Sequence, residues 1–168
     1  MFSYRHAFHA GNHADVLKHL VLIHSVQYLQ EKDAAVMLVD THAGAGMYSL
    51  KSEYANTKAE YLDGIAKLWG AQDLPSVIKE YVDLVQLCNA KGHWDLYPGS
   101  PEIIRRSIRP DDRMRLFELH PTDFDILEEH FDKSKIAKVF KGDGFDGLKA
   151  LLPPPTRRAV IFMDPPYE

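Results

Sequence analysis

The sequence has one cysteine, no long apolar run and no excess of positive charge. Cys88 alone cannot form an internal disulfide, which suits a reducing compartment. No apolar run approaches the roughly 20 residues that a membrane-spanning helix needs. The N-terminus, MFSYRHAFHAGNH, lacks the cationic start and apolar stretch of a secretory signal. These absences exclude a disulfide scaffold and predict a cytoplasmic protein without a membrane span.

Charge and composition indicate one globular domain. The 168 residues are 45% hydrophobic and 26% charged, with a net charge of −4. Such an acidic balance does not by itself indicate nucleic-acid binding. The basic residues are nevertheless clustered, and the clusters are Arg105, Arg106, Arg109, Arg113 and Arg115, then Lys133, Lys135, Lys138 and Lys141, then Arg157 and Arg158. We expect most of the lysines on solvated helix faces, with a local phosphate-contacting patch as the alternative.

Strand and helix patterns alternate along most of the chain. Buried strands are expected at 35–40, 114–119, 137–140 and 159–163, and helices at 13–31, 122–131 and 145–152. Asn12 is expected to cap the first helix, and a further helix begins at Ser100 as N-cap with Pro101 in its first turn. This alternation predicts an α/β fold with a mostly parallel sheet and right-handed crossovers.

The stretch from about 53 to 97 differs in character. It has no strand signal and predicts two helices, roughly 58–70 and 76–91, the second entered at Pro75. We interpret it as an inserted helical subdomain within a single domain that spans residues 1–168.

Each predicted strand ends in a residue type that could bind a ligand. The first runs into Asp40 and the small-residue loop THAGAG, which contains His42; the second ends at Glu118, the third at Asp143 and Gly144, and the fourth at Asp164. Taken singly, these are ordinary turns, solvated loop acids and helix caps. Ligands bind at the carboxyl ends of parallel strands, and the order fits S-adenosylmethionine: methionine end, ribose, adenine, then the target amine.

The last motif, Asp164-Pro165-Pro166-Tyr167, suits methylation of an exocyclic amine on a nucleobase. The lone pair of such an amine is delocalised into the ring, so the nitrogen is a poor nucleophile. If the Asp164 carboxylate and the Pro165 carbonyl accept its N–H hydrogens, the lone pair can point at an electrophilic methyl group. The prolines fix the backbone, and Tyr167 offers a ring on which a flipped-out base can stack.

The N-terminal segment is rich in histidine, with His6, His9, His13, His19 and His24. His9 and His13 have helical ligand spacing, but no cysteine partners them, so we favour surface or ligand-binding histidines and expect no metal. Lys18 and His19 are placed to meet the carboxylate of a bound amino acid if their helix packs over the Gly-rich loop. Tyr4, ahead of the helix, could act as a lid or stack on a base, and the alternative is a core anchor.

With these residues in view, the chain resembles the RlmJ family of 23S ribosomal RNA adenine-N6 methyltransferases. The resemblance covers essentially the whole sequence and is carried by SYRHAFHAGNHADVLKH, DTHAGAG, YPGSP, FELHP, GDGF and DPPYE. It implies a Rossmann-like class I methyltransferase sheet, of which the chain holds the first four strands, with an inserted helical subdomain. Family members continue beyond DPPY, so we expect the chain to be the N-terminal part of such a domain.

The resemblance also implies site residues. Cofactor contacts are expected at His19, His42, Ser100, Glu118, Asp143, Gly144 and Asp164, with Lys18 as an addition. Asp164 is then the catalytic residue, and Tyr4, Pro165 and Tyr167 lie on the substrate RNA side. The implied partner is 23S ribosomal RNA, with a monomer favoured.

Two rival functions stay open at this stage. The same motif suits a methyltransferase that acts on DNA adenine or on a protein glutamine. A non-catalytic module that binds the cofactor or RNA is the other alternative.

Overall fold

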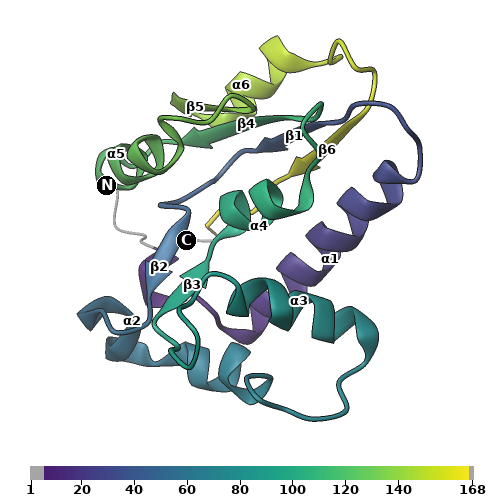
Figure 1. Cartoon of the computed structure of the whole chain (residues 1–168). Coiled ribbons are helices and arrows are strands. Elements are labelled where there is room, and N and C mark those ends of the chain that lie inside the picture. The colour runs from purple at the N-terminus through teal and green to yellow at the C-terminus, as the bar shows by residue number, and fades with distance from the viewer. Residues whose placement is uncertain (1–5, 167–168) are drawn as a thin grey trace.

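A four-stranded parallel sheet organises residues 6–166, the part of the chain that the structure, a computed structural model, describes (Figure 1). Its strands are β1 (Met37–Asp40), β4 (Arg113–Glu118), β5 (Ala137–Lys141) and β6 (Ala159–Phe162), in the order β5-β4-β1-β6. Every neighbouring pair is parallel. The predicted α/β fold with a parallel sheet is therefore confirmed, and the carboxyl ends of all four strands share one edge.

The helices between the strands begin and end close to the predicted positions. They are α1 (His13–Gln30), α4 (Ser100–Ser107), α5 (Pro121–Phe131) and α6 (Gly144–Leu151), with a short 3₁₀ turn, η1 (His6–Phe8), before them. Asn12 caps α1 as predicted, because its side-chain oxygen accepts the Asp15 backbone N–H at 2.9 Å. No helix within 6–166 is both long and apolar enough to span a bilayer.

The prediction for 53–97 is wrong in its details. In place of a helix over 58–70, the chain forms α2 (Glu53–Lys58) and two 3₁₀ turns, η2 (Glu60–Asp63) and η3 (Ile65–Lys67). Ala59 adopts a left-handed conformation with φ 51°, which ends α2. The next helix, α3 (Ser76–Gln86), stops short of 91 because the Asn89 side chain accepts the backbone N–H groups of Asp95 and Leu96.

A second, two-stranded sheet was not predicted. β2 (Met47–Ser49) and β3 (Leu96–Pro98) pair antiparallel and flank the helical stretch. Each strand has only three residues and β3 ends in proline, so neither shows a recognisable strand pattern. The pairing brings the two ends of the helical stretch together beside the Gly-rich loop.

Ser100 does not cap α4, contrary to the prediction. Gly99 is the N-cap, with an extended backbone, and Ser100 is the first residue of the helix. Gly99 donates its backbone N–H to the Gly46 carbonyl at 2.9 Å. This bond fixes the start of α4 against the Gly-rich loop and turns Ser100 into the interior, where it is 7% exposed.

The sheet has a large core on one face and a small one on the other. Leu38, Met114 and Leu116 join a large core with α1, α4 and the α5 residues Leu127 and Phe131. On the other face, alternate strand residues pack with α6, namely Met37, Val39 and Phe117 with Phe140, Leu148, Leu151, Ala159 and Ile161. This alternation follows from the two-residue period of strand side chains.

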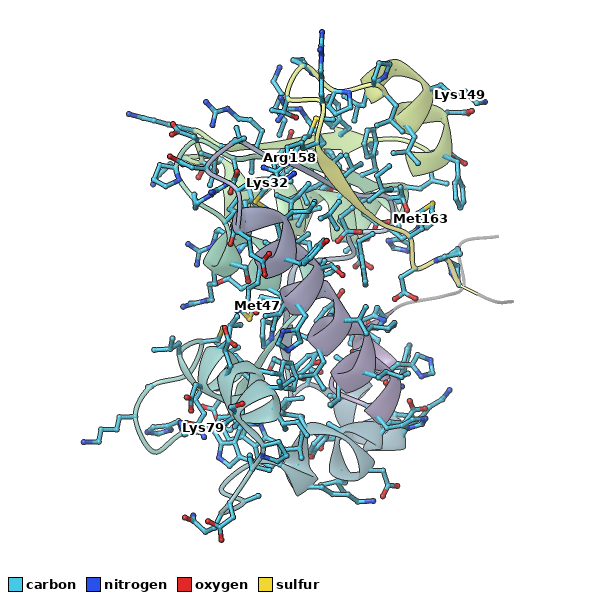
Figure 2. The ribbon with its side chains drawn as sticks, turned by 90° about the vertical axis from the view of Figure 1, so that its right-hand side faces the viewer. Lys32, Met47, Lys79, Lys149, Arg158 and Met163 are labelled. Atoms are coloured by element: carbon cyan, nitrogen blue, oxygen red, sulfur yellow. The ribbon has the colours of Figure 1, made fainter. Side chains whose placement is uncertain are left out.

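Helix α1 is tied to β6 at both ends. Arg158, just before β6, donates to the Ala34 carbonyl at 2.7 Å and also to the Leu29 carbonyl. At the other end, beyond Met163, the Asp164 carboxylate accepts from Lys18 of α1. Figure 2 shows Arg158 beside Lys32 where α1 ends, with Met163 at the far end of the strand. The helix therefore runs alongside β6 and reaches the ligand-binding edge of the sheet.

We expect Gly147→Ala to destabilise the fold by about 1–3 kcal/mol, the usual cost of overpacking. A Cβ at this position would lie 2.2 Å from the Phe117 ring. Phe117 is buried and stacked on Phe140 with ring centroids 4.9 Å apart, so the ring has little room to move. The measurement is the urea midpoint at unchanged m-value.

Gly142→Ala is the matched control, because a Cβ there meets no atom within 4 Å. Equal midpoints for the two variants would contradict close packing of α6 on β4.

Candidate active site

The four predicted acids meet at the carboxyl edge of the parallel sheet. Asp40 and Glu118 are the last residues of β1 and β4, Asp143 follows β5, and Asp164 follows β6. Their charges act on one another: those of Asp164 and Glu118 both disfavour ionisation of Asp40. The structure therefore brings together the acids that the sequence placed at separate strand ends.

Glu118 shapes the Gly-rich loop. Its Oε2 accepts the Gly44 backbone N–H and its Oε1 accepts the His120 backbone N–H, each at 2.7 Å. Gly44 has a φ of +61°, which favours glycine, and a Cβ there would lie 2.2 Å from the Tyr48 hydroxyl. The loop thus depends on glycine for its path and on the Glu118 carboxylate for its position.

Asp40 is the most deeply buried acid of the site. It is 0% exposed, its Oδ1 accepts the His42 backbone N–H at 3.1 Å, and its Oδ2 is buried without a hydrogen bond from residues 6–166. Burial raises the pKa of Asp40 to about 7, assisted by the charges of Asp164 and Glu118 and opposed by the Ser100 hydroxyl and the His42 N–H. Asp40 is therefore poised between its neutral and charged forms near neutral pH.

His42, Asp143 and Gly144 lie together between β1 and β5. The His42 ring nitrogen Nδ1 is 2.8 Å from the Thr41 hydroxyl, and its ring lies edge-on to Phe145 with centroids 5.2 Å apart. Burial lowers the pKa of His42, while the charges of Glu118, Asp143 and Asp164 act to raise it. The site therefore favours a neutral imidazole here.

Asp143 is the N-cap of α6. Its Oδ1 accepts the backbone N–H groups of Phe145 and Asp146 at 2.8 and 3.2 Å, so the helix-cap alternative holds in the structure. Gly144 is buried against the Thr41 backbone, where a Cβ would lie 2.3 Å from the carbonyl oxygen. Around Gly142 and the exposed ring of Phe145, in contrast, the surface is open.

Asp164 is bonded to α1. Lys18 Nζ donates to Asp164 Oδ2 and lies 3.1 Å from Asp15 Oδ1. Burial would lower the pKa of Lys18, but the Asp15 and Asp164 carboxylates raise it above its usual value. The Lys18 ammonium is therefore firmly charged, and it joins the predicted catalytic acid to the start of α1.

His19 lies deeper than expected for a ligand-binding residue. It is 3% exposed, and its Nδ1 is 2.9 Å from the Tyr97 hydroxyl, which in turn is 2.8 Å from the Tyr81 hydroxyl. Burial lowers the pKa of His19 to about 4. A neutral His19 anchors α1 to β3 and α3, and a cofactor contact by this residue stays a prediction.

The remaining predicted residues are those expected to lie on the RNA side of the site, namely Tyr4, Pro165 and Tyr167. Pro165 is half-buried next to Asp164. Tyr4 and Tyr167 lie outside the described residues. Within 6–166, no three His, Cys, Asp or Glu side chains are grouped so that they could hold a metal ion.

A comparison with known protein families shows to which family the chain belongs. The family described as ribosomal RNA large subunit methyltransferase D, RlmJ, matches residues 33–168. The chain belongs to this family. It is 51% identical over 168 residues to ribosomal RNA large subunit methyltransferase J of Escherichia coli and 44% identical over 169 residues to the protein of that name from Haemophilus influenzae. It spans 60% of the length of each of these relatives.

The fold of this RlmJ-family chain is similar to a solved structure. A crystal structure of a Legionella pneumophila protein matches 95% of this chain with a TM-score of 0.87 and 41% sequence identity. The match covers 58% of the Legionella chain.

The sequence did not predict that His6 and Asp15 belong to the site. The sequence reasoning took His6 only as one of the N-terminal histidines and did not single out Asp15 as a site residue, yet Asp15 Oδ2 lies 2.8 Å from His6 Nε2. The one available signal was the three-residue spacing of Asp15 and Lys18, which places them on the same side of a helix.

The raised pKa of Asp40 predicts a pH-dependent stability. Because the folded pKa of about 7 lies above the unfolded value near 4, the folded state binds the proton more tightly in this interval. The free energy of unfolding of the wild type, relative to Asp40→Asn, should fall as pH rises from about 4 to 7 and stay constant above 7.

Asn retains an oxygen for the His42 N–H but does not titrate, so the difference between the two proteins isolates this carboxyl. Urea unfolding of both proteins at several pH values measures it. A difference that is independent of pH would contradict the raised pKa.

Proposed function

We propose that this chain carries the cofactor site and catalytic acid of an S-adenosylmethionine-dependent methyltransferase that methylates the N6 of an adenine in 23S ribosomal RNA. The observation that carries the proposal is Asp164-Pro165-Pro166 at the end of β6, on the same sheet edge as Asp40, Glu118 and Asp143. Membership of the RlmJ family supports it. On this proposal the sheet belongs to a Rossmann-like class I methyltransferase fold, and residues 53–97 form an inserted helical subdomain.

The residues at this edge fit S-adenosylmethionine. The buried Asp40 Oδ2 lacks a hydrogen-bond donor among residues 6–166, and the surface around Gly142 leaves open space. We assign the methionine end to the Gly-rich loop with His42 and Ser100, beside Lys18 and His19. Glu118 would hold the ribose, and Asp143 with Gly144 would hold the adenine. When bound, the cofactor supplies an electrophilic methyl group.

The chain's own contribution to the reaction is alignment of the target amine. In the described part of the chain, Lys18 bonds Asp164 Oδ2, and Oδ1 accepts no hydrogen bond. Oδ1 and the Pro165 carbonyl would accept the two N–H hydrogens of the adenine amine, so that its lone pair points towards the methyl group. Much of the rate enhancement would then come from proximity and orientation, with the surplus proton of the amine lost afterwards to solvent.

The RNA side of the site is the remaining part of the proposal. Tyr167 would stack on the flipped-out adenine, and Tyr4 would approach it from the N-terminal segment. In the sequence, Tyr4 precedes η1 and Tyr167 follows β6. We place the reaction in the cytoplasm, with the protein acting as a monomer on ribosomal RNA.

Asp164→Ala should abolish methyl transfer and leave cofactor affinity within about threefold, because the carboxylate is assigned to the amine. The measurement is transfer of a tritiated methyl group to unmodified 23S RNA. The chain would be assayed alone and joined to the C-terminal part of its Escherichia coli relative, with that full-length relative as positive control. A variant that methylates near the wild-type rate would refute the catalytic role.

The same assay separates the rival substrates. Duplex DNA and release-factor protein replace 23S RNA as acceptors in parallel reactions. Transfer to either one, with none to RNA, would replace the RNA proposal. Cofactor binding without transfer to any acceptor would point to a binding module.

Glu118→Gln should weaken S-adenosylmethionine binding by about tenfold or more, which corresponds to about 1.4 kcal/mol. Loss of the charge weakens two backbone hydrogen bonds that position the loop and removes a charged acceptor for the ribose hydroxyls. Isothermal titration calorimetry measures the affinity. Glu128→Gln, on the exposed surface of α5, is the control, and equal affinities for the two variants would overturn the assignment.

A further inference from the structure

Asp15 is a buried carboxylate beside the catalytic edge that the proposed mechanism does not use. It is 1% exposed, although it lies in the first turn of α1, where acids are usually solvated. Its Oδ2 accepts the Gly11 backbone N–H at 2.9 Å and lies 2.8 Å from His6 Nε2, and its Oδ1 is 3.1 Å from Lys18 Nζ. Burying a carboxylate is costly unless its oxygens are satisfied. The Asp15 side chain therefore connects α1 with the segment that precedes it, and through Lys18 it also connects α1 with Asp164.

We propose that Asp15 is a positioning residue that holds Lys18 and His6 in place at the catalytic Asp164, an inference that rests on the proposed function. Asp15 does not touch the reacting atoms. It acts through Lys18, whose ammonium it shares with Asp164.

Sharing of the Lys18 ammonium between Asp15 and Asp164 affects how Asp164 can bind the amine of the target adenine. A lysine side chain is long and flexible, and a single ion pair at a half-exposed site fixes it weakly. Asp15 lies three residues before Lys18 on the same side of α1 and anchors the ammonium from within the helix. The ammonium therefore approaches Asp164 from one direction and bonds Oδ2, so that Oδ1 is kept for the substrate. Without the Asp15 charge, the ammonium is free to move across both oxygens of Asp164.

His6 is held by the same carboxylate. Burial would lower the pKa of His6, but the charge and hydrogen bond of Asp15 overcome this and raise it above its usual value. The His6 ring is also braced against Tyr48, with centroids 5.2 Å apart. Among the described residues, the charge of Lys18 also opposes protonation of His6, and that of Asp164 favours it. His6, Asp15, Lys18 and Asp164 form one coupled chain of charges.

The test is Asp15→Asn in the methyl-transfer assay, with the chain joined to the C-terminal part of its Escherichia coli relative. Asparagine has nearly the same shape and retains an acceptor oxygen for the Gly11 N–H. We expect kcat to fall at least tenfold, while the KM for RNA and the Kd for S-adenosylmethionine stay within about threefold of the wild type. The pKa of His6, followed by NMR of its ring protons, should fall in the same variant.

Asp112→Asn is the matched control. Asp112 is an equally buried acid at the opposite end of the sheet, where it accepts the Val36 backbone N–H at 2.8 Å. We expect this variant to lose stability but to keep its kcat and the His6 pKa. Should Asp15→Asn not fold, Asp15→Glu, which keeps the charge but displaces it, takes its place with the same expected fall in kcat.

The outcomes separate this inference from the function on which it rests. A wild type inactive on 23S RNA would remove the proposed function, whatever Asp15 does. The wild type could instead be active, the Asp164→Ala variant inactive, and the Asp15→Asn variant as fast as the wild type. That result would overturn the positioning role of Asp15 and leave the proposed function in place. A proportionate loss of kcat and cofactor affinity in Asp15→Asn would also overturn it, because it would indicate general collapse of the site.

Discussion

Parallel pairing of β1 with both β4 and β6 is the constraint on which the site depends. Asp40 is opposite Leu116 and Phe162 in this register, so β4 and β6 both end beside the point where β1 ends. Residues separated by more than a hundred positions in the sequence, such as Asp40 and Asp164, are therefore delivered to one edge. A shift of one residue in this pairing would turn the core residues of β1 to the opposite face, so the packing of the core also fixes the position of the acids.

The acids at this edge are kept in different states by their surroundings. Asp40 is buried with little compensation, which raises its pKa to about 7. Asp15 is equally buried, but the charge and hydrogen bond of His6, together with the charge of Lys18, hold its pKa well below the usual value despite the cost of burial. Both carboxylate oxygens of Glu118 accept hydrogen bonds from backbone N–H groups. Asp40 and Asp15 therefore differ in pKa because each carboxylate has different partners.

Helix α1 provides the second constraint. Arg158 ties its end to the start of β6, and Lys18 ties its first turns to the end of that strand. The helix also carries His19, which reaches the hydroxyl of Tyr97 in the second sheet. One element thus connects the parallel sheet, the helical stretch and the predicted catalytic acid.

The sequence by itself determined the alternating elements and the residues at the strand ends, because hydrophobic periodicity and capping are local properties. Asn12, Glu118, Asp143 and Asp164 were placed correctly on their elements for this reason. The helix over 58–70, the cap at Ser100 and the absence of strands near 97 were wrong. Gly99 and the β2–β3 pairing depend on contacts with distant segments, and Ala59 adopts a left-handed conformation that helical periodicity does not reveal. Only the tertiary structure decided that Asp15 is buried between His6 and Lys18, since burial of a helix face and the sharing of an ammonium between residues 15 and 164 depend on how α1 packs against β6.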